Sequence, residues 1–422
     1  MDGRADQLTA FTSAESATDS AIILHVDCDC FYAACERLRR PELDTEPVVI
    51  GMGYEQANPH GAVATASYEA REYGIESAMP IEDALERLPR AVDADSDDPD
   101  TPEPDNTGYY LPVDMEHYQS IGADVHAILE QYADPFEPIS IDEAYLDVTE
   151  TTSWDRVDAF AQTLKKEIST TVGIPVSIGV APTKSAAKVA SDHDKPDGLV
   201  VVPPGEVQSF FEPLNVEAVH GIGPVTAQQL HDLGIETAGD LATADTETIE
   251  TALGDRGREL QQRAQGHDPR PVSVPDDPKS ISKETSMGRD PVTDRTVKQE
   301  TVRELAQQVF QRADEKDALY QTIGIKVVEP PFDINTRERS LSGPIQDQEL
   351  LEGVALDLLE GFAEASVRKL GVRVSNLSFA EQRQASLSAW KTGETTRSTQ
   401  PRPAHIKQRL TTTGAQTTLD EF

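Results

Sequence analysis

The chain has 422 residues, enough for about three domains of ordinary size, with 75 Asp and Glu against 37 Lys and Arg and a net charge of −38. A wholly disordered acidic protein is excluded, because stretches such as AIILHVD, PVSIGVAP and QTIGIKVVE have the β-branched density of real strands. We therefore expect a folded protein adapted to concentrated salt, which screens the repulsion between its acids.

The first segment predicts a polar leader followed by a strand and a helix. Residues 1–19 lack the basic start and apolar core of a secretory signal, and we expect a flexible leader. The stretch AIILHVD then predicts a strand that ends at Asp27, and the hydrophobic period becomes helical near Phe31. Because no run has the length that a membrane span requires, we expect no membrane association.

The cysteines indicate an intracellular, cytoplasmic protein. Cys28, Cys30 and Cys35 are odd in number and crowded within eight residues, which is no disulfide framework. A zinc site made with His25 is disfavoured, because a closed site needs four suitably spaced ligands and no second Cys/His pair follows.

A smaller mixed segment follows the first helix. It contains the strand PVVIG and the stretch AVATASYEAREYGI. Residues 91–105, AVDADSDDPDTPEPD, hold seven acids, three prolines and no base. We interpret them as a solvated surface insertion adapted to salt, without a specific function.

Strands and helices then alternate as far as residue 203. Helix-like sequence at 114–132 precedes FEPISIDEAYLDVT, which predicts two short strands joined at Asp142 and Glu143. After a second helix, WDRVDAFAQTLKKEISTTV, the stretch PVSIGVAPTKSAAKVASDHDKPDGLVVV predicts a strand, turn, helix, loop and strand. This alternation predicts an α/β sheet domain.

The rest of the chain predicts a helical segment, a linker and a strand-rich domain. Residues 205–268 are compact and helical, DPRPVSVPDDP is a Pro-rich linker, and 279–380 are rich in strands. A polar tail, with abundant Thr, Gln, Ser and Arg, ends the chain.

The stretch SIDEAYLD sets two adjacent carboxylates between apolar runs. Successive side chains of a strand point to opposite faces, so one acid would be pushed toward a buried surface, where an unpaired charge is costly. At a hairpin tip this alternation relaxes, and Asp142 and Glu143 can lean toward one point. If the strand that ends at Asp27 lies beside the hairpin, three carboxylates meet, and their repulsion requires bound divalent metal.

The expected metal is a hard divalent cation, because oxygen ligands of this kind favour Mg²⁺ or Mn²⁺. Two such ions about 3.5–4 Å apart suit phosphoryl transfer, since one activates an attacking oxygen and the other neutralises and orients the leaving phosphates. The alternative is that Asp27 merely ends a strand and that the DE pair is a polar turn, since acids are common in turns.

Four motifs, HVDCDCFYAACE, AVATASYEAREYGI, SIDEAYLDVT and SIGVAPTKSAAKVASDHDKPDG, occur in this order. Together they resemble the Y family of DNA polymerases, closest to its DNA polymerase IV (DinB-like) branch, in a haloarchaeal type. The resemblance implies a multidomain α/β (α+β) fold with the right-hand form of a polymerase. Its parts are a palm at 20–32 and 105–203, fingers at 33–92, an acidic insertion at 93–104, a helical thumb at 204–268, a linker at 269–278, a separate β-rich little finger at 279–380 and a flexible tail at 381–422.

The resemblance also implies the catalytic set. Asp27 and Asp142 become metal ligands, the backbone carbonyl of Cys28 also reaches a metal, and Glu143 becomes the metal-binding acid nearest the primer end. The implied cofactor is a pair of Mg²⁺ ions, for which Mn²⁺ can substitute.

A nucleotide pocket follows from the same resemblance. Tyr32 is implied to lie beneath the sugar of the incoming nucleotide and to exclude a 2′-hydroxyl by crowding; the alternative is a core aromatic at the strand-to-helix junction. Hydroxyl, guanidinium and ammonium groups suit triphosphate oxygens. The other nucleotide-binding residues implied are Phe31, Thr65, Tyr68, Arg71 and Lys195.

Two regions are expected to hold primer–template DNA. In VHGIGPVTAQQLHDLGI, Gly221 and Gly223 precede a helix as in a helix-hairpin-helix, whose backbone N–H groups grip a phosphate without reading sequence. In the little finger we expect six basic residues to contact phosphates from one face of a sheet: Lys279, Lys283, Arg337, Arg339, Lys369 and Arg373.

The chain ends in GAQTTLDEF, which follows the pattern of a peptide that binds a sliding clamp (PCNA). Gln416, Leu419 and Phe422 are spaced by three, which places the apolar pair on one side of a helical turn. Residues 382–419 carry six bases and one acid, so this tether could contact DNA while the terminus holds the clamp.

These features predict a monomeric, template-directed DNA polymerase that adds deoxynucleoside triphosphates to a primer 3′ end. The resemblance further implies low-fidelity translesion synthesis in DNA repair. Two alternatives stay open. A catalytically idle, clamp-associated DNA-binding scaffold would have no use for intact Asp27, Asp142 and Glu143, and a metal-dependent nuclease would leave the triphosphate donors without a purpose.

Overall fold

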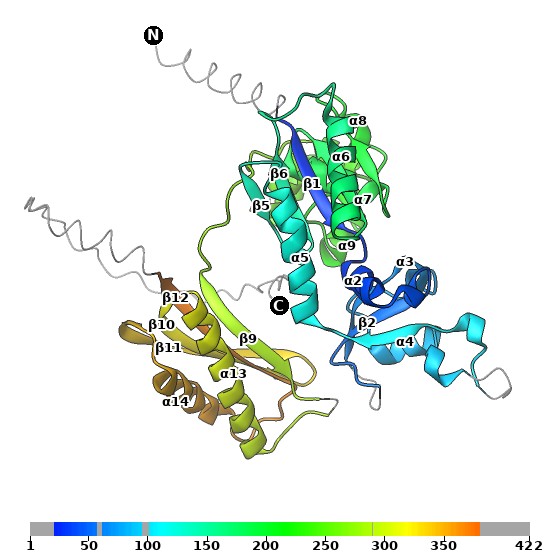
Figure 1. Ribbon diagram of the computed structural model, residues 1–422. Coiled ribbons are helices and arrows are strands. Elements are labelled where there is room, and N and C mark those ends of the chain that lie inside the picture. Colours follow the sequence, from blue (N-terminus) through cyan, green and yellow to red (C-terminus); the bar gives the residue numbers. More distant parts are fainter. Residues whose placement is uncertain (1–20, 57–60, 95–100, 289, 380–422) are drawn as a thin grey trace, which may run out of the picture. The chain divides into compact units, whose positions relative to one another are not determined.

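The computed structural model describes residues 21–56, 61–94, 101–288 and 290–379. It divides into two compact units, Met1–Pro275 and Asp276–Phe422, each with its own sheets and cores (Figure 1). Across the described ranges no helix combines the length and the apolar character needed to cross a membrane. The residues expected to bind a clamp, Gln416, Leu419 and Phe422, lie outside the described residues.

The main sheet of the first unit has the strand order β5-β6-β1-β7-β8. The central strand β1 (Ile23–Cys28) is antiparallel to both β6 (Glu143–Asp147) and β7 (Val176–Ala181). The edge strands are β5 (Phe136–Pro138) and β8 (Leu199–Val201). Every residue of β1 is buried, which explains why it is mostly apolar, and its two polar residues, His25 and Asp27, are buried with it.

Helices cover both faces of this sheet. One hydrophobic core joins Leu24 and Val26 of β1 to α5 (Met115–Leu129) and α6 (Val157–Thr171). A different core joins Ile23 to α7 (Lys184–His193). Because side chains alternate along a strand, His25 and Asp27 lie on the same face as Ile23, toward α7.

The packing of α7 on the sheet is unusually close at one glycine. A Cβ atom added to Gly179 of β7 would lie 2.0 Å from the carbonyl oxygen of Ala187 and 2.2 Å from the amide nitrogen of Ser191. Both contacts are with the backbone of α7, so only a residue without a side chain lets the helix approach this far. The approach brings the polar face of α7 to the end of β1.

A second sheet of the first unit has the strand order β3-β2-β4. In the sequence its three strands come between β1 and β5 of the main sheet. It is built from β2 (Val48–Met52), β3 (Ala62–Ala66) and β4 (Tyr109–Pro112), with the helices α3 (Tyr68–Arg71) and α4 (Ile81–Arg87). The helix that follows β1, α2 (Phe31–Arg39), contacts β2 and β3. Thus β4 joins this smaller sheet, although it falls within the segment 105–203 assigned from sequence to the palm. Two short 3₁₀ turns, Ala91–Asp93 and Pro104–Asn106, flank the acidic insertion.

The helical segment after β8 shares a core with α7. Its buried residues, among them Phe211, Leu230 and Leu260, belong to the same hydrophobic cluster as Ala187. The segment is tied to the start of α7 because the buried carboxylate of Asp268 accepts a hydrogen bond from the Ser185 amide, 3.1 Å away. Its helices are α8 (Val207–Phe211), α9 (Pro224–His231), α10 (Ala238–Thr243), α11 (Thr246–Leu253) and α12 (Asp255–Ala264).

The second unit is a four-stranded antiparallel sheet with two helices on one face (Figure 1). Its strand order is β11-β10-β12-β9, and its core joins β10 and β12 to α13 and α14. The fully buried ammonium of Lys298 donates to three backbone carbonyls, which fixes α13 to the turn after α14. The elements are β9 (Ser280–Ser286), α13 (Arg295–Glu315), β10 (Leu319–Glu329), β11 (Asp333–Ile345), α14 (Gln348–Leu359), a 3₁₀ turn (Glu360–Phe362) and β12 (Lys369–Ser378).

The strand register separates basic residues that the sequence analysis put on one face. Arg337 and Lys283 lie in one row with the buried Ile325 and Val372, so they occupy the face that the helices cover. On that face Arg337 stacks over the ring of Phe362, with its guanidinium carbon 5.3 Å from the ring centroid.

The remaining basic residues divide in the same way. Arg339 follows Arg337 by two residues and reaches Asp357 of α14 at 3.1 Å. Arg373 and Lys369 lie on the opposite, open face, and both are exposed. The prediction of one shared face is therefore wrong, because alternate positions were counted within each strand without the register between strands.

We predict that Gly179→Ala lowers the free energy of unfolding of the first unit by about 3 kcal/mol, because the new methyl group collides with the backbone of α7. Thermal unfolding in concentrated KCl measures the effect. Gly353→Ala, inside α14 of the second unit, is the control for a methyl group that meets nothing within 4 Å, and it should leave the first unit unchanged. Stability of the first unit equal to wild type in Gly179→Ala would contradict the close packing of α7.

Candidate active site

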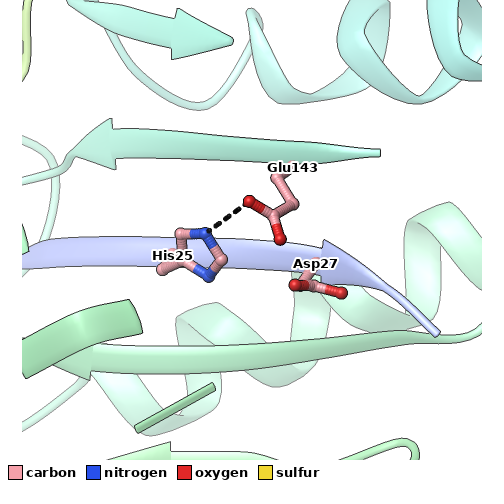
Figure 2. A group of neighbouring side chains, drawn as sticks. All are labelled: His25, Asp27 and Glu143. Carbon is pink, nitrogen blue, oxygen red and sulfur yellow. Dashed lines mark ion pairs between the residues drawn. The ribbon is translucent and has the colours of Figure 1, made fainter. Parts of the chain in front are cut away.

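Two acids face each other across neighbouring strands. Asp27, near the end of β1, is the register partner of Glu143, the first residue of β6. Side chains of directly opposed residues share a face, so both carboxylates lie on the face that α7 covers. Figure 2 shows the two carboxylates beside His25. A ring nitrogen of His25 and one oxygen of each acid lie within 4.8 Å of one another. The chain thus gathers two carboxylates and an imidazole near the end of a fully buried strand.

The turn before β6 explains how adjacent acids avoid the alternation of a strand. Ser140 accepts hydrogen bonds from the amides of Asp142 and Glu143, at 3.3 and 3.1 Å, and donates to the Asp142 carboxylate at 2.5 Å. Asp142 therefore lies in the turn, whereas Glu143 begins the ladder. The carbonyl of Asp142 accepts from the Cys28 amide at 3.0 Å, so the turn lies beside the end of β1. The Asp142 carboxylate is held by Ser140 and is not in the group that Asp27, Glu143 and His25 form.

Two lysines supply positive charge to the facing acids. The Lys188 ammonium, from α7, is 3.0 Å from Asp27 Oδ2 and 2.6 Å from Glu143 Oε1. The Lys195 ammonium, from the loop after α7, is 2.7 Å from Asp27 Oδ1 and 2.7 Å from Asp192 Oδ1. Both oxygens of Asp27 are thus engaged by ammonium groups.

Burial and the neighbouring charges change the pKa values of these acids. It raises the pKa of Asp27 to about 7, although Lys188 and Lys195 act in the opposite direction. Burial also raises the pKa of Asp142. For Glu143 burial is again unfavourable to the charge, but the close Lys188 ammonium outweighs it and holds the pKa of Glu143 below its usual range. Of the two facing acids, Glu143 keeps its charge and Asp27 is the first to take a proton.

His25 is a neutral member of the site. It is fully buried, and burial lowers its pKa to about 4. Its Nδ1 lies 2.7 Å from the Ser191 hydroxyl, which itself donates to the carbonyl of Lys188. Its Nε2 is 3.8 Å from Glu143 Oε2, too far for a hydrogen bond (dashed line in Figure 2). The imidazole borders the acids without neutralising them.

The donor set fits a hard divalent cation. Asp27 and Glu143 offer carboxylate oxygens on one face, and Asp142 offers a third carboxylate from the adjoining turn. The raised pKa values of Asp27 and Asp142 show that burial disfavours their charges, and a divalent ion would restore them. Oxygen donors of this kind suit Mg²⁺ or Mn²⁺.

Comparisons with known proteins bear on the family to which the chain belongs. The impB/mucB/samB family matches residues 26–192, its C-terminal domain matches 278–387, and the IMS family HHH motif matches 204–235. The chain is 51% identical over 408 residues to a DNA polymerase IV of Halobacterium salinarum, which covers 96% of this chain and 97% of that protein. It is 38% identical over 371 residues to a DNA polymerase IV of Methanoculleus marisnigri, with 88% and 98% of the two chains covered.

Solved structures extend the likeness to the fold. A Y-family DNA polymerase chimera of Dbh and Dpo4 matches with a TM-score of 0.72 at 28% identity, over 85% of this chain and 99% of that one. DinB from Sulfolobus solfataricus matches with a TM-score of 0.57 at 27% identity and the same coverage.

The chain belongs to the Y family of DNA polymerases. Within the family it is of the DNA polymerase IV type, with a relative in Halobacterium. The sequence resemblance and the predicted right-hand fold, with a separate β-rich little finger, are thereby confirmed.

The family nucleotide motifs lie around the second sheet and α2. Tyr68 and Arg71 share the single turn of α3, with the Arg71 guanidinium 4.8 Å from the Tyr68 ring centroid, and Thr65 is half-buried on β3. Phe31 is buried in the main core, whereas Tyr32 is half-buried and stacks on Tyr118, with ring centroids 4.5 Å apart.

The thumb motif has the expected backbone. Gly221 takes a φ of 96°, which favours glycine, and Gly223 caps the N-terminus of α9. A Cβ at Gly223 would meet nothing within 4 Å, so the backbone there is open to approach.

Sequence reasoning missed two residues that hold this polymerase site together. Lys188 lies within the motif that supplied Lys195, and its spacing of four from Asp192 on a helix was the signal for an ion pair. Asp29 is 2% exposed, and its carboxylate accepts from the Ser177 hydroxyl, the Tyr68 hydroxyl and the Asp197 amide. It joins α3 to the loop that carries Lys195, a connection over long range that no local pattern reveals.

We predict that Asp29→Ala lowers the free energy of unfolding by about 3 kcal/mol, since the buried Ser177 hydroxyl and two partly buried donors lose their acceptor. The Michaelis constant for deoxynucleotides should rise as well, because Tyr68 and the Lys195 loop lose a common anchor. Thermal unfolding and steady-state kinetics measure the two effects. Asp155→Ala, at an exposed acid, is the control, and a stability equal to that control would refute the role of Asp29.

Proposed function

We propose that this chain extends the 3′ end of a primer on a DNA template with deoxynucleoside triphosphates, by phosphoryl transfer at Asp27, Asp142 and Glu143. Membership of the family supports the polymerase activity, with low-fidelity translesion synthesis in DNA repair as its role. The observation that carries the proposal is the pairing of Asp27 with Glu143 across β1 and β6, beside Asp142 in the turn.

Two Mg²⁺ ions are the cofactor that we propose, with Mn²⁺ able to substitute. Asp27, Asp142, Glu143 and the backbone carbonyl of Cys28 would hold them. When bound, such ions activate the primer hydroxyl and neutralise the departing pyrophosphate. The chain itself fixes the geometry, because the ladder sets Glu143 opposite Asp27 and Ser140 orients Asp142.

The incoming nucleotide is proposed to lie between α3 and the end of β1. Tyr68 and Arg71, held together on α3, and Lys195 offer donors to the triphosphate, with Thr65 and Phe31 as neighbours in the pocket. Tyr32 would crowd the 2′ position of the sugar. Its ring stacks on Tyr118, whose hydroxyl donates a hydrogen bond to the buried Glu36 at 2.9 Å. This packing would keep the Tyr32 ring from moving aside for a 2′-hydroxyl.

Template and primer are proposed to contact the thumb and the open face of the little finger. Gly221 and Gly223 present backbone near the start of α9 for a phosphate. On the little finger, Lys369 and Arg373 remain the proposed phosphate contacts, because they lie on the open face of the sheet. The other basic residues of the strands lie on the helix-covered face and are no longer proposed: Lys283, Arg337 and Arg339. Lys279 lies just before β9 and stays a candidate contact.

The remaining parts of the proposal concern organisation and partners. We infer the domain boundaries given from sequence, with a monomeric chain that acts in the cytoplasm on chromosomal DNA. The C-terminal Gln416, Leu419 and Phe422 would engage a sliding clamp of the PCNA type. The match to the family over both units supports the division into a catalytic unit and a little finger.

Primer extension tests the function. In KCl with MgCl₂, wild-type protein should extend a labelled primer, and Asp142→Asn should lower the rate by at least about a thousandfold, because the developing charge loses a ligand of its counter-ion. Asp155→Asn is the exposed control. Binding of DNA without extension would favour the scaffold, and shortening of the labelled DNA without nucleotides would favour the nuclease.

A second test concerns the sugar. Tyr32→Ala should raise the use of ribonucleotides relative to deoxynucleotides by about a hundredfold, because one hydroxyl no longer collides with the ring. Competition between matched ribo- and deoxynucleotides measures the ratio, with the exposed Tyr109→Ala as the control. An unchanged ratio would show that Tyr32 does not exclude the 2′-hydroxyl.

A further inference from the structure

We infer that Lys188 is an internal cation that competes with divalent metal for Asp27 and Glu143, so that metal loading displaces its ammonium group. The inference rests on the proposed metal site. Lys188 lies between the two facing carboxylates, 3.0 Å from Asp27 Oδ2 and 2.6 Å from Glu143 Oε1. A cation shared by these two acids would take the same position. Lys188 thus acts as a positioning residue through the acids.

The site carries enough positive charge to stay assembled without metal. Two carboxylates that face each other in a buried setting repel strongly, and each contact with an ammonium group offsets part of that repulsion. Lys188 bridges both acids, whereas Lys195 contacts only Asp27. Lys188 is therefore the group that keeps the pair together, and it is also the group that a divalent ion must move.

Asp192 offers a place for the displaced ammonium. Its Oδ2 is 3.6 Å from Lys188 Nζ, one helical turn along α7, and its carboxylate is about half exposed. A lysine has a flexible four-carbon stem, so a small rotation can exchange Asp27 and Glu143 for Asp192. Lys195 also contacts Asp192 at 2.7 Å, and the proposed triphosphate would give that lysine another partner. Metal and nucleotide binding would then both release ammonium groups from Asp27.

The test is thermal unfolding of the full chain in KCl, titrated with MnCl₂ and separately with MgCl₂, without DNA or nucleotide. Lys188→Met removes the competing charge, so the metal concentration that gives a fixed rise in melting temperature should fall at least about fivefold. Lys188→Arg keeps the charge and should respond within about twofold of wild type. Lys166→Met, at an exposed lysine of α6, is the matched control and should respond as wild type does.

The possible outcomes distinguish the Lys188 inference from the proposed metal site. If metal stabilises wild type and Lys188→Met at the same concentration, or the variant needs more metal, the Lys188 inference is wrong while the metal site stands. If metal stabilises neither protein, the proposed metal site fails and the inference fails with it. Should Lys188→Met not fold without metal, Lys188→Gln takes its place with the same expectation, because its amide can still donate to a carboxylate.

Discussion

The central constraint on the catalytic unit is that the repulsion between Asp27 and Glu143 must be offset. The antiparallel ladder sets these acids directly opposite each other at the end of a buried strand, where water cannot screen their charges well. A proton on Asp27 or nearby positive charge makes that arrangement tolerable, and Lys188 and Lys195 supply positive charge. A site that requires cations for its own stability is a site prepared to bind metal, which links the fold to the chemistry of the family.

The rest of the catalytic unit brings those cations and their neighbours into place. Gly179 lets α7 approach β7 without an intervening side chain, and this close contact delivers Lys188 to the facing acids. Asp29, two residues after Asp27, then ties the loop of Lys195 to Tyr68 on α3. One strand end thus organises the proposed metal ligands, the proposed phosphate donors and the joint between the main sheet and α3.

Local patterns predicted what is local in this protein. The apolar run before Asp27, the change of period near Phe31 and the junction of two strands at Asp142 each depend on neighbouring residues, and β1, α2 and the turn before β6 follow them, with Glu143 already in β6. Residues that act across the sheet escaped notice, because Lys188 and Asp29 gain their roles only when α7, β7 and α3 are assembled. The faces of the little finger were misjudged for the same reason. The register between β10, β11 and β12 decides which face Arg337 or Arg373 occupies, and the sequence of a single strand does not determine that register.

The most direct measurement is the position of the metal. A crystal of the protein with primer–template DNA, a non-hydrolysable deoxynucleotide and Mn²⁺ can be examined by anomalous scattering. The account predicts two peaks about 3.5–4 Å apart, coordinated by Asp27, Asp142 and Glu143, with the Lys188 ammonium withdrawn toward Asp192. Peaks bound elsewhere, or no peak while Lys188 still bridges Asp27 and Glu143, would contradict it.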